Sequence, residues 1–426
     1  MKFILSTSHI LFATTLLLSA CQPSSQKDTL APNPVGSSID LPQPFDTEVA
    51  VQIPLNIGWQ PGQKPTVPEG FEVSAYIKAI DNPLWLHTLD DGSVLVAQSG
   101  VQQLELSKKE GLNRILHTRD LDEDGYAEAQ RIFTQHTIGV CGMAHSDSVI
   151  YYADSYRIYK ATFAEGQTAL YQKQTLTDLP GGGYHGHWMR NILIDPSGEF
   201  LYVTVGSLTN AMIDPLKLEE EQGRAAILKV DLQTGKKEFY AHGMRNPVGM
   251  DFEPTTGKLW AVVSERKDLG DNLVPDYLTE VEYGDFFGWP WYYWGNHVDP
   301  RHKEIPVVDQ DIKKPDYSLG AHIEARDLMF YKGNNFPAEW SHGAFVAENG
   351  SWNRSELSGY QVAYVPFENG KPSGDPIPFM TGFLDGSPKE NTHGRPSGLA
   401  LLPDGSVLVA DDAGNMVWKV SFTGEQ

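Results

Sequence analysis

Three short segments of the chain concentrate histidine, arginine and asparagine: residues 181–191, 242–249 and 350–354. Each contains an arginine next to an asparagine, and the first also carries His187. The planar guanidinium of arginine suits carboxylates, and a neutral histidine can accept a proton near pH 7. Taken alone, each arginine could pair with a neighbouring aspartate or with strand carbonyls. Because the pattern occurs three times in a chain of net charge −22, we expect Arg190, Arg245 and Arg354 to form a local anion site.

A recurrent phrase predicts the elements that position these segments. A turn containing Asp or Gly is followed by β-branched and aromatic residues, as in Leu89–Ala97 and Leu402–Ala410. The six turns are marked by Gly92, Asp147, Gly198, Gly257, Gly343 and Gly405, and five copies are followed by a second short strand. A period of roughly 50 to 60 residues is typical of propeller blades. The sequence therefore predicts an all-β, six-bladed β-propeller; a β-sandwich or two tandem β-domains would need no such repetition.

One step of the repeat is longer than the others. It indicates a long inter-blade insertion, from about Arg266 to Phe330, and loops on a rigid ring commonly carry function. This insertion contains Trp289, Trp291, Tyr292, Tyr293 and Trp294. With Trp188 they could wall a flat ligand or pack in the core, and both interpretations stay open. Helical periodicity is weak, and its best candidate is Leu216–Arg224.

The first residues predict the compartment. Residues 1–20 have the layout of a signal peptide, and Leu18–Cys21 resembles the lipobox of bacterial lipoproteins. We expect Cys21 to be lipidated; an ordinary signal peptide is the alternative. This predicts the periplasmic side of a bacterial cell envelope, with contact to the membrane through the lipid anchor only. Gln22 is not the aspartate associated with inner-membrane retention, which favours the outer membrane.

The next stretch differs in composition from the rest of the chain. Residues 21–64 are rich in proline, serine and glutamine, which predicts a flexible tether. The part from Ile53 onward could still pack as a strap against the propeller, which we place at residues 65–424. So acidic a chain repels nucleic acid. No Cys-x-x-Cys-His motif occurs, which excludes a c-type haem, so released electrons would pass to an external acceptor, a quinone or a cytochrome.

An ordered set of motifs makes a family resemblance specific. The motifs are His187–Asn191, Leu201–Ser207, Met244–Gly249, Phe287–Pro290, Gly350–Arg354 and Gly394–Gly398. Their types and order resemble the quinoprotein glucose/sorbosone dehydrogenase family, over roughly residues 65 to 424, and the sorbosone-like branch most. The resemblance implies pyrroloquinoline quinone and Ca²⁺ as cofactors and a sugar or related polyol as substrate.

The resemblance also implies roles for single residues. His187 matches the general base that takes the proton of the substrate hydroxyl. The residues that would contact the quinone and its carboxylates are Arg190, Asn191, Arg245, Asn246, Asn353, Arg354 and Arg395. The segment Ser264–Asp271 matches the calcium loop, with carbonyls near Glu265 and Arg266 as ligands and Asp271 as a nearby anion. Relatives with a well-defined calcium site have Gly-Pro where Glu265 and Arg266 stand, a departure that backbone ligation tolerates.

Other acidic groups are ambiguous. Asp120–Gly125 resembles the opening of a calcium loop, but its twelfth position is Arg131, so it is no EF-hand and a solvated turn is favoured. Asp411 and Asp412 could bind a cation or cap a turn. Besides a dehydrogenase, the sequence allows a metal-dependent propeller hydrolase such as a lactonase, or a propeller that binds glycan or an envelope partner without catalysis. The hydrolase would need carboxylates in the channel, where we expect arginine and histidine.

Overall fold

The computed structural model describes residues 33–100, 112–164, 166–181 and 187–424 of the 426-residue chain. Residues 33–426 form one compact unit. The predicted signal peptide and Cys21 lie outside the described residues, as do residues 182–186 of the histidine segment. No helix of the described part is long and apolar enough to cross a membrane.

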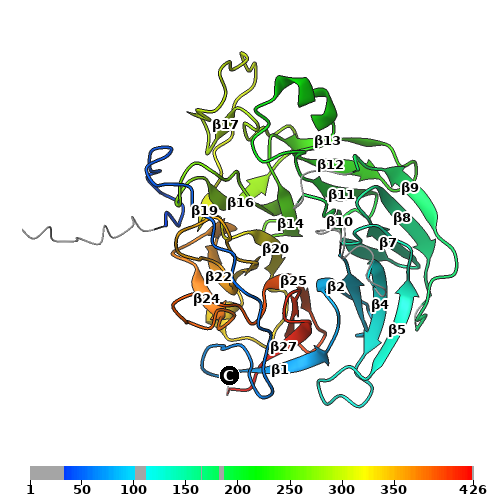
Figure 1. Cartoon of the computed structure of the whole chain (residues 1–426). Helices are drawn as coiled ribbons and strands as arrows, with labels where there is room; N and C mark the ends of the chain where they lie inside the picture. The colour runs from blue at the N-terminus through cyan, green and yellow to red at the C-terminus, as the bar shows by residue number, and fades with distance from the viewer. Residues whose placement is uncertain (1–32, 101–111, 165, 182–186, 425–426) are drawn as a thin grey trace, which may run out of the picture. The chain divides into compact units, whose positions relative to one another are not determined.

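Six antiparallel sheets confirm the predicted propeller (Figure 1). The first three sheets follow the chain without interruption. Blade 1 holds β2 (Pro83–Thr88), β3 (Val94–Gln98), β4 (Arg114–Arg119) and β5 (Ala129–Thr134). Blade 2 holds β6 (Met143–Ser146), β7 (Val149–Ala153), β8 (Arg157–Thr162) and β9 (Gln174–Asp178). Blade 3 holds β10 (Ile192–Ile194), β11 (Phe200–Val205), β12 (Ala226–Asp231) and β13 (Lys237–His242).

The remaining sheets complete the ring. Blade 4 holds β14 (Pro247–Phe252), β15 (Leu259–Val263), β16 (Pro275–Val281) and β19 (Tyr317–Ala321). Blade 5 holds β20 (Ala325–Phe330), β21 (Gly343–Glu348), β22 (Gln361–Glu368), β23 (Lys371–Pro372) and β24 (Ile377–Met380). Blade 6 holds β25 (Pro396–Leu401), β26 (Val407–Asp411), β27 (Met416–Phe422) and β1 (Phe71–Lys78). Because β1 pairs with β27, the two ends of the propeller domain meet in one sheet, which closes the ring.

The repeated phrase of the sequence corresponds to one hairpin in every blade. Five of its six markers lie in the turn that joins the first strand of a blade to the second, as Gly198 lies between β10 and β11. The marker of blade 5, Gly343, is the first residue of β21. The short strands that follow the copies are the third strands, β4, β8, β12, β22 and β27. Apolar residues on both faces of these strands fill the space between neighbouring blades.

The first strands contact one another in a ring, β2–β6–β10–β14–β20–β25, around the central channel. Glycines allow the backbones to approach closely. A Cβ on Gly249 would lie 2.4 Å from the Leu328 amide nitrogen, and one on Gly142 would lie 2.4 Å from the amide nitrogen of Ile192. The Asp251 carboxylate also accepts a 2.9 Å bond from the Phe330 amide, which ties blade 4 to blade 5.

The long insertion lies within blade 4 rather than between blades, which corrects the expectation from the sequence. It connects β16 to β19 and contains the small hairpin of β17 (Tyr292–Tyr293) and β18 (His297–Val298). Spacing between turns shows only that a blade is long, and the strand pairing β16–β19 shows where the extra chain sits. The helix candidate at 216–224 contains two short 3-10 turns, η2 (Pro215–Lys217) and η3 (Glu219–Glu221); a third, η4 (Ala338–Trp340), precedes β21.

Residues 33–59, which we name the strap, run along the propeller although their composition suggested a flexible tether. The strap begins beside β19, where the Gly36 amide donates to the Ser318 carbonyl at 2.9 Å. It ends at Trp59, whose indole N–H donates to Asp411 of blade 6 at 2.7 Å. In Figure 1 this dark blue segment passes β19 and β22 on its way to β1. Proline removes donors but leaves carbonyls, so a proline-rich chain can still be held in extended form.

We expect Gly249→Ala to destabilise the ring. The added Cβ would meet the backbone of β20, which has no side-chain rotamer with which to yield, so the free energy of unfolding should fall by about 1–3 kcal/mol. Gly257→Ala is the control, because its Cβ has nothing within 4 Å and it bears only the strain of a positive φ. Chemical denaturation of both variants measures the difference; equal losses would contradict the close approach of β14 and β20.

Candidate active site

The candidate residues gather at one end of the channel. The segments that precede the inner strands β10, β14, β20 and β25 contain His187, Arg245, Glu324 and Arg395. The loops between the second and third strands of blades 3 and 4 reach the same end, as the Arg245 contacts with Asn210 and Ser264 show. The corresponding loop of blade 5 joins them through Arg354, which donates to the Asp271 carbonyl. A propeller brings these loops together because every blade repeats the same up-and-down order.

His187 is buried, with 4% of its surface exposed. Its Nδ1 lies 2.9 Å from the Ser207 carbonyl and 3.1 Å from the Ser207 hydroxyl. A carbonyl only accepts hydrogen bonds, so Nδ1 carries the proton and Nε2 carries the lone pair. Burial lowers the pKa of His187 well below its ordinary value of 6.5, and the Arg245 cation lowers that pKa further. Both effects favour the neutral imidazole of His187, whose lone pair is then on Nε2.

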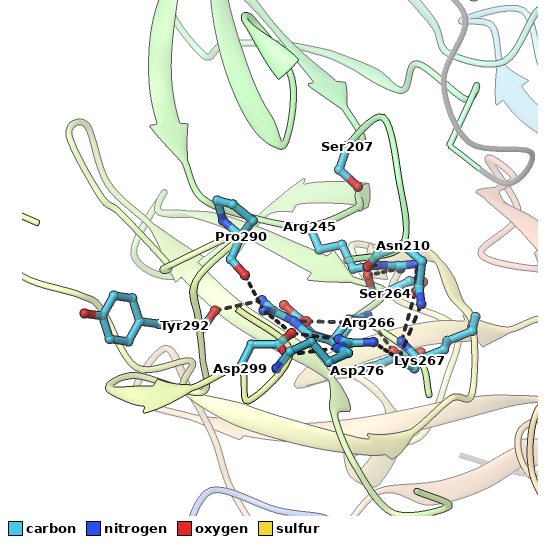
Figure 2. A network of polar contacts seen from close by, with 12 residues as sticks. Ser207, Asn210, Arg245, Ser264, Arg266, Lys267, Asp276, Pro290, Tyr292 and Asp299 are labelled. Atoms are coloured by element: carbon cyan, nitrogen blue, oxygen red, sulfur yellow. Dashed lines mark hydrogen bonds and ion pairs between the residues drawn. The ribbon is translucent and has the colours of Figure 1, made fainter. Parts of the chain in front are cut away.

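Arg245 is held by neutral acceptors. Its Nε and Nη2 donate to the backbone carbonyl and side-chain Oδ1 of Asn210 at 3.0 and 2.9 Å, and Nη1 donates to the Ser264 carbonyl at 3.0 Å (Figure 2). Arg245 is buried, with 1% of its surface exposed. These contacts use three of its five N–H groups and fix the plane of the guanidinium. They leave its positive charge without a contacting carboxylate among the described residues.

Gly206 holds His187 and Asn246 at their observed separation. A Cβ at Gly206 would lie 2.2 Å from the Asn246 Oδ1 and 2.9 Å from the His187 Cβ. The backbone of Asn246 is fixed too, since its carbonyl accepts a 3.0 Å bond from the Ser264 amide. Only a residue without a side chain fits between these two groups.

Sequence reasoning missed three charged residues, Lys267, Glu324 and Arg326. With His187 and Arg245 they form a group that we name the cluster. The Lys267 ammonium forms an ion pair with Glu324 and lies 5.4 Å from the centre of the Trp352 ring. Arg326 lies 4.0 Å from the same carboxylate. The Lys267 and Arg326 cations hold the pKa of Glu324 far below its ordinary value, against the effect of burial. The signal that could have found these two residues is their place at an inner strand: Glu324 directly precedes β20, and Arg326 is its second residue.

The other candidate arginines have different partners. Arg190 is fully buried and donates to the carbonyls of His187, Met189 and Pro180 at 2.8–2.9 Å. Arg354 donates to the carbonyls of Asp271 and Glu356. Each guanidinium therefore fastens the loop that surrounds it. Asn191 follows Arg190 at the start of β10 and is buried, as is Asn353, whose Oδ1 has no partner among the described residues.

The backbone carbonyls of the predicted metal loop differ in their hydrogen bonds. The Ser264 carbonyl accepts from Arg245, and the Lys267 carbonyl accepts from Arg301 at 2.8 Å. Between them, the Arg266 carbonyl accepts a long bond of 3.4 Å from the Val274 amide, and the Glu265 carbonyl has no hydrogen-bond donor among the described residues. The Asp271 carboxylate accepts hydrogen bonds from the amide and hydroxyl of Ser355.

The Arg266 side chain points away from this loop toward the insertion. It donates to the carbonyls of Pro290 and Tyr292 at 2.9 and 2.7 Å and pairs with Asp299 at 3.3 Å (Figure 2). Its guanidinium carbon also lies 4.8 Å from the centre of the Trp289 ring. The insertion therefore supports the metal loop from outside, and Trp289, Tyr293 and Trp294 are buried among its contacts rather than forming an open wall.

A cavity of about 410 Å³ opens beside the cluster. Trp188 and Trp352 line it, and both are next to the cluster, since Trp188 follows His187 and Trp352 lies under Lys267. Arg395 also lines the cavity, where it pairs with both oxygens of Asp412 at 3.1 Å. Asp411 is used structurally: it accepts from Trp59 and from the Arg395 amide, while burial raises its pKa to about 6.

A separate acidic group lies on an outer turn of blade 1. Asp120, Asp122, Asp124 and Glu128 can bring one oxygen each within 4.8 Å of the others. Asp120 accepts bonds from the amides of Glu123 and Gly125, as in a solvated turn. The three other carboxylates are exposed, and nothing else at this turn indicates a metal.

Comparisons with known proteins agree on the family and the fold. The model of the Glucose / Sorbosone dehydrogenase family matches residues 80–362, and a TrAA12-like model matches residues 305–423. An uncharacterized protein of Borreliella burgdorferi is 28% identical over 376 residues, which cover 84% of this chain and 90% of that relative.

Solved structures show the same fold at low identity. A calcium structure of a Trichoderma reesei Carbohydrate-Active Enzymes Family AA12 protein has a TM-score of 0.70, at 18% identity, over 84% of this chain and 97% of that chain. The holo form of the PQQ domain of Coprinopsis cinerea pyranose dehydrogenase has a TM-score of 0.68, at 19% identity, over 86% and 99%. The apo form of the soluble aldose sugar dehydrogenase of Escherichia coli has a TM-score of 0.57, at 16% identity, over 83% and 99%.

We expect Gly206→Ala to displace His187. The added methyl would push the imidazole from the Ser207 carbonyl, so the pKa of His187 should rise toward 6.5 as its burial loosens. Histidine NMR measures this: the His187 signal should show a neutral Nδ1–H form across pH 5.5–8 in the parent protein and should titrate in the variant. Assignment comes from the signal lost in His187→Asn. An unchanged His187 signal in Gly206→Ala would contradict the role of this glycine.

Proposed function

Because the chain belongs to the glucose/sorbosone dehydrogenase family, we propose that it oxidises a sugar or related polyol with pyrroloquinoline quinone and Ca²⁺ as cofactors. The observation that carries this proposal is the pairing of a neutral, buried His187 with a nearby cationic cluster. In this proposal His187 is the catalytic base. Its Nε2 takes the proton of the substrate hydroxyl, and its Nδ1–H keeps the ring oriented toward Ser207.

The cluster fits a flat ligand that carries several carboxylates. Arg245, Lys267 and Arg326 bring three cations to one place. Glu324 is the carboxylate nearest to Lys267 and Arg326, while Glu265 and Asp276 act on Arg245 without contacting it. Buried polar atoms also lack partners among the described residues, namely Arg326 Nε, Asn353 Oδ1 and Trp188 Nε1. A buried polar group without a partner is costly, so such atoms indicate a polar ligand. We propose that Arg245, Asn246, Lys267 and Asn353 hold the quinone, while Arg190 and Arg354 position the loops around it.

The carbonyls of Glu265 and Arg266 fit a calcium ion, because calcium prefers oxygen ligands and tolerates irregular geometry. When bound, the quinone supplies a two-electron acceptor and the calcium ion polarises its carbonyl oxygen. The protein would keep the base neutral, orient the substrate hydroxyl and exclude water at the buried end of the channel. The electrons then leave to an external acceptor, a quinone or a cytochrome.

We expect His187→Asn to bind the cofactor but to lose turnover. Titration of protein in Ca²⁺ with pyrroloquinoline quinone, followed by the quinone absorbance, should give the same uptake as the parent protein. Dye reduction with a panel of aldoses should fall by roughly 10²–10⁴-fold, the usual contribution of a general base. His242→Asn, on the outer strand of blade 3, is the control and should leave both readouts unchanged.

Other outcomes separate the alternatives. Unchanged turnover in His187→Asn would remove His187 from the mechanism. Hydrolysis of lactones without quinone would favour a propeller hydrolase. Failure of the parent protein to take up quinone would favour a propeller that binds its ligand without catalysis.

We expect the pH profile of kcat/KM to have its acidic limb well below pH 6.5. Only the neutral form of His187 is a base, and its folded-state pKa is lowered by burial and by Arg245. Activity should therefore stay level as the pH falls through 6.5 and decline only near the lowered pKa. Rates at saturating cofactor between pH 4.5 and 8 measure this. An acidic limb centred at pH 6.5 would show that His187 is exposed to solvent when it acts.

A further inference from the structure

The strap forms one wall of the cavity that contains Arg395. Ile53, Pro54 and Asn56 of the strap line the cavity, and Trp188 and Trp352 of the propeller line it as well. Residues far apart in the sequence therefore share one site, which joins the cluster around His187 through the two tryptophans. Nothing in the propeller repeat itself supplies this wall.

Hydrogen bonds hold the strap in place at this point. The Gln52 amide donates to the Trp352 carbonyl at 2.8 Å, directly before Ile53. The Leu55 carbonyl accepts from the Thr392 amide at 2.9 Å, and the Asn56 side chain donates to the Ala413 carbonyl at 2.8 Å. Bonds on both sides of Ile53 and Pro54 therefore fix the backbone that presents them.

The strap carries an apolar residue at every second position: Val49, Val51, Ile53, Leu55 and Ile57. All five are exposed, and Ile53 is the most exposed at 75%. Single exposed aliphatic residues are ordinary. Of Ile53 and Val51, only Ile53 lines the cavity. The two residues therefore form a matched pair, alike in chemistry and exposure and different in their relation to the site.

The polar side of the cavity has little net charge. Arg395 is the cation that faces it, and Asp412 binds this guanidinium through both oxygens. An anionic ligand would have to compete with Asp412 for Arg395, whereas a neutral polyol can bind amide and hydroxyl groups without breaking the pair. Aromatic and aliphatic walls also suit the C–H faces of a sugar ring.

We propose that Ile53 and Pro54 form the apolar wall of the substrate site. This wall and the Arg395–Asp412 pair together select neutral sugars over sugar acids. The proposal rests on the proposed function, since it assigns the cavity to the same substrate. Ile53 acts as a specificity-determining residue that contacts the part of the sugar away from the reacting carbon. Its loss should weaken binding without slowing the chemical step.

Cysteine labelling tests the wall without turnover. Ile53→Cys and Val51→Cys are made in protein whose Cys21 is replaced by serine, so that Cys141 is the other thiol. Cys141 is fully buried and its pKa is raised by burial, so it should not react. The labelling rate with a fluorescent maleimide is measured with glucose, galactose, mannose, cellobiose or glucuronate present.

We expect at least one neutral sugar to slow labelling at position 53, by about tenfold when its concentration is ten times its Kd. Labelling at position 51 should not change, and glucuronate should protect neither position. Equal effects at both positions, protection by glucuronate, or no protection by any of the four neutral sugars would overturn the proposal.

Kinetics of Ile53→Ser against Val51→Ser separate this proposal from the proposed function. We expect KM to rise roughly tenfold in Ile53→Ser, with kcat unchanged, as when binding shared by ground and transition states is lost. Val51→Ser should match the parent protein. If a sugar protects position 53 but the protein shows no quinone-dependent turnover, the proposed function is refuted and the role of Ile53 in sugar binding stands. If a neutral sugar is turned over with identical kinetics in both serine variants, the role of Ile53 in substrate binding is refuted and the proposed function stands.

Discussion

The site depends on the burial of positive charge that has neutral partners. Arg245 is removed from water and held by two oxygens of Asn210 and one carbonyl of Ser264, none of which cancels its charge. Desolvation lowers its pKa, and only Glu265, Glu324 and Asp276 oppose this shift from a distance. A buried cation without a contacting anion is unfavourable unless something compensates it. Burial favours the neutral form of His187, and this cation favours it further. The anionic cofactor that we propose would compensate the charge of Arg245.

The fold keeps this arrangement rigid by using backbone as the main partner. Arg190 and Arg354 donate to carbonyls of the loops beside His187 and Asp271. Backbone carbonyls can move only when the strands they adjoin move, and those strands are fixed by the close packing of the inner ring. Side-chain partners would allow each guanidinium to change rotamer. The same device recurs in the strap, whose bonds to Trp352 and Thr392 are made by main-chain atoms.

The propeller could be predicted from the sequence, but only part of the candidate site could. Six turns with a similar spacing were sufficient for the propeller, because every blade except the sixth, which takes β1 from the start of the domain, is a local unit of antiparallel strands. The same Arg-Asn pattern at residues 190 and 245 predicted one role, yet one guanidinium binds its own loop and the other faces the cluster. Which carbonyls lie within reach depends on neighbouring blades and cannot be seen in a motif. Lys267 and Glu324 were missed for the same reason: they meet across 57 positions of the chain.

The loop at Glu265 and Arg266 shows how the fold accommodates two neighbouring buried charges. Both side chains are charged, and both are buried. The Arg266 guanidinium turns outward and binds Glu265, Asp299 and two carbonyls of the insertion. The carboxylates of Glu265 and Asp299 therefore neutralise the charge of Arg266. The insertion in blade 4 is what makes this possible, since it supplies Asp299 and Trp289 as partners for a cation that would otherwise be buried alone. Proline restricts a loop through its own ring, and here an ion pair with a neighbouring hairpin provides the restriction instead.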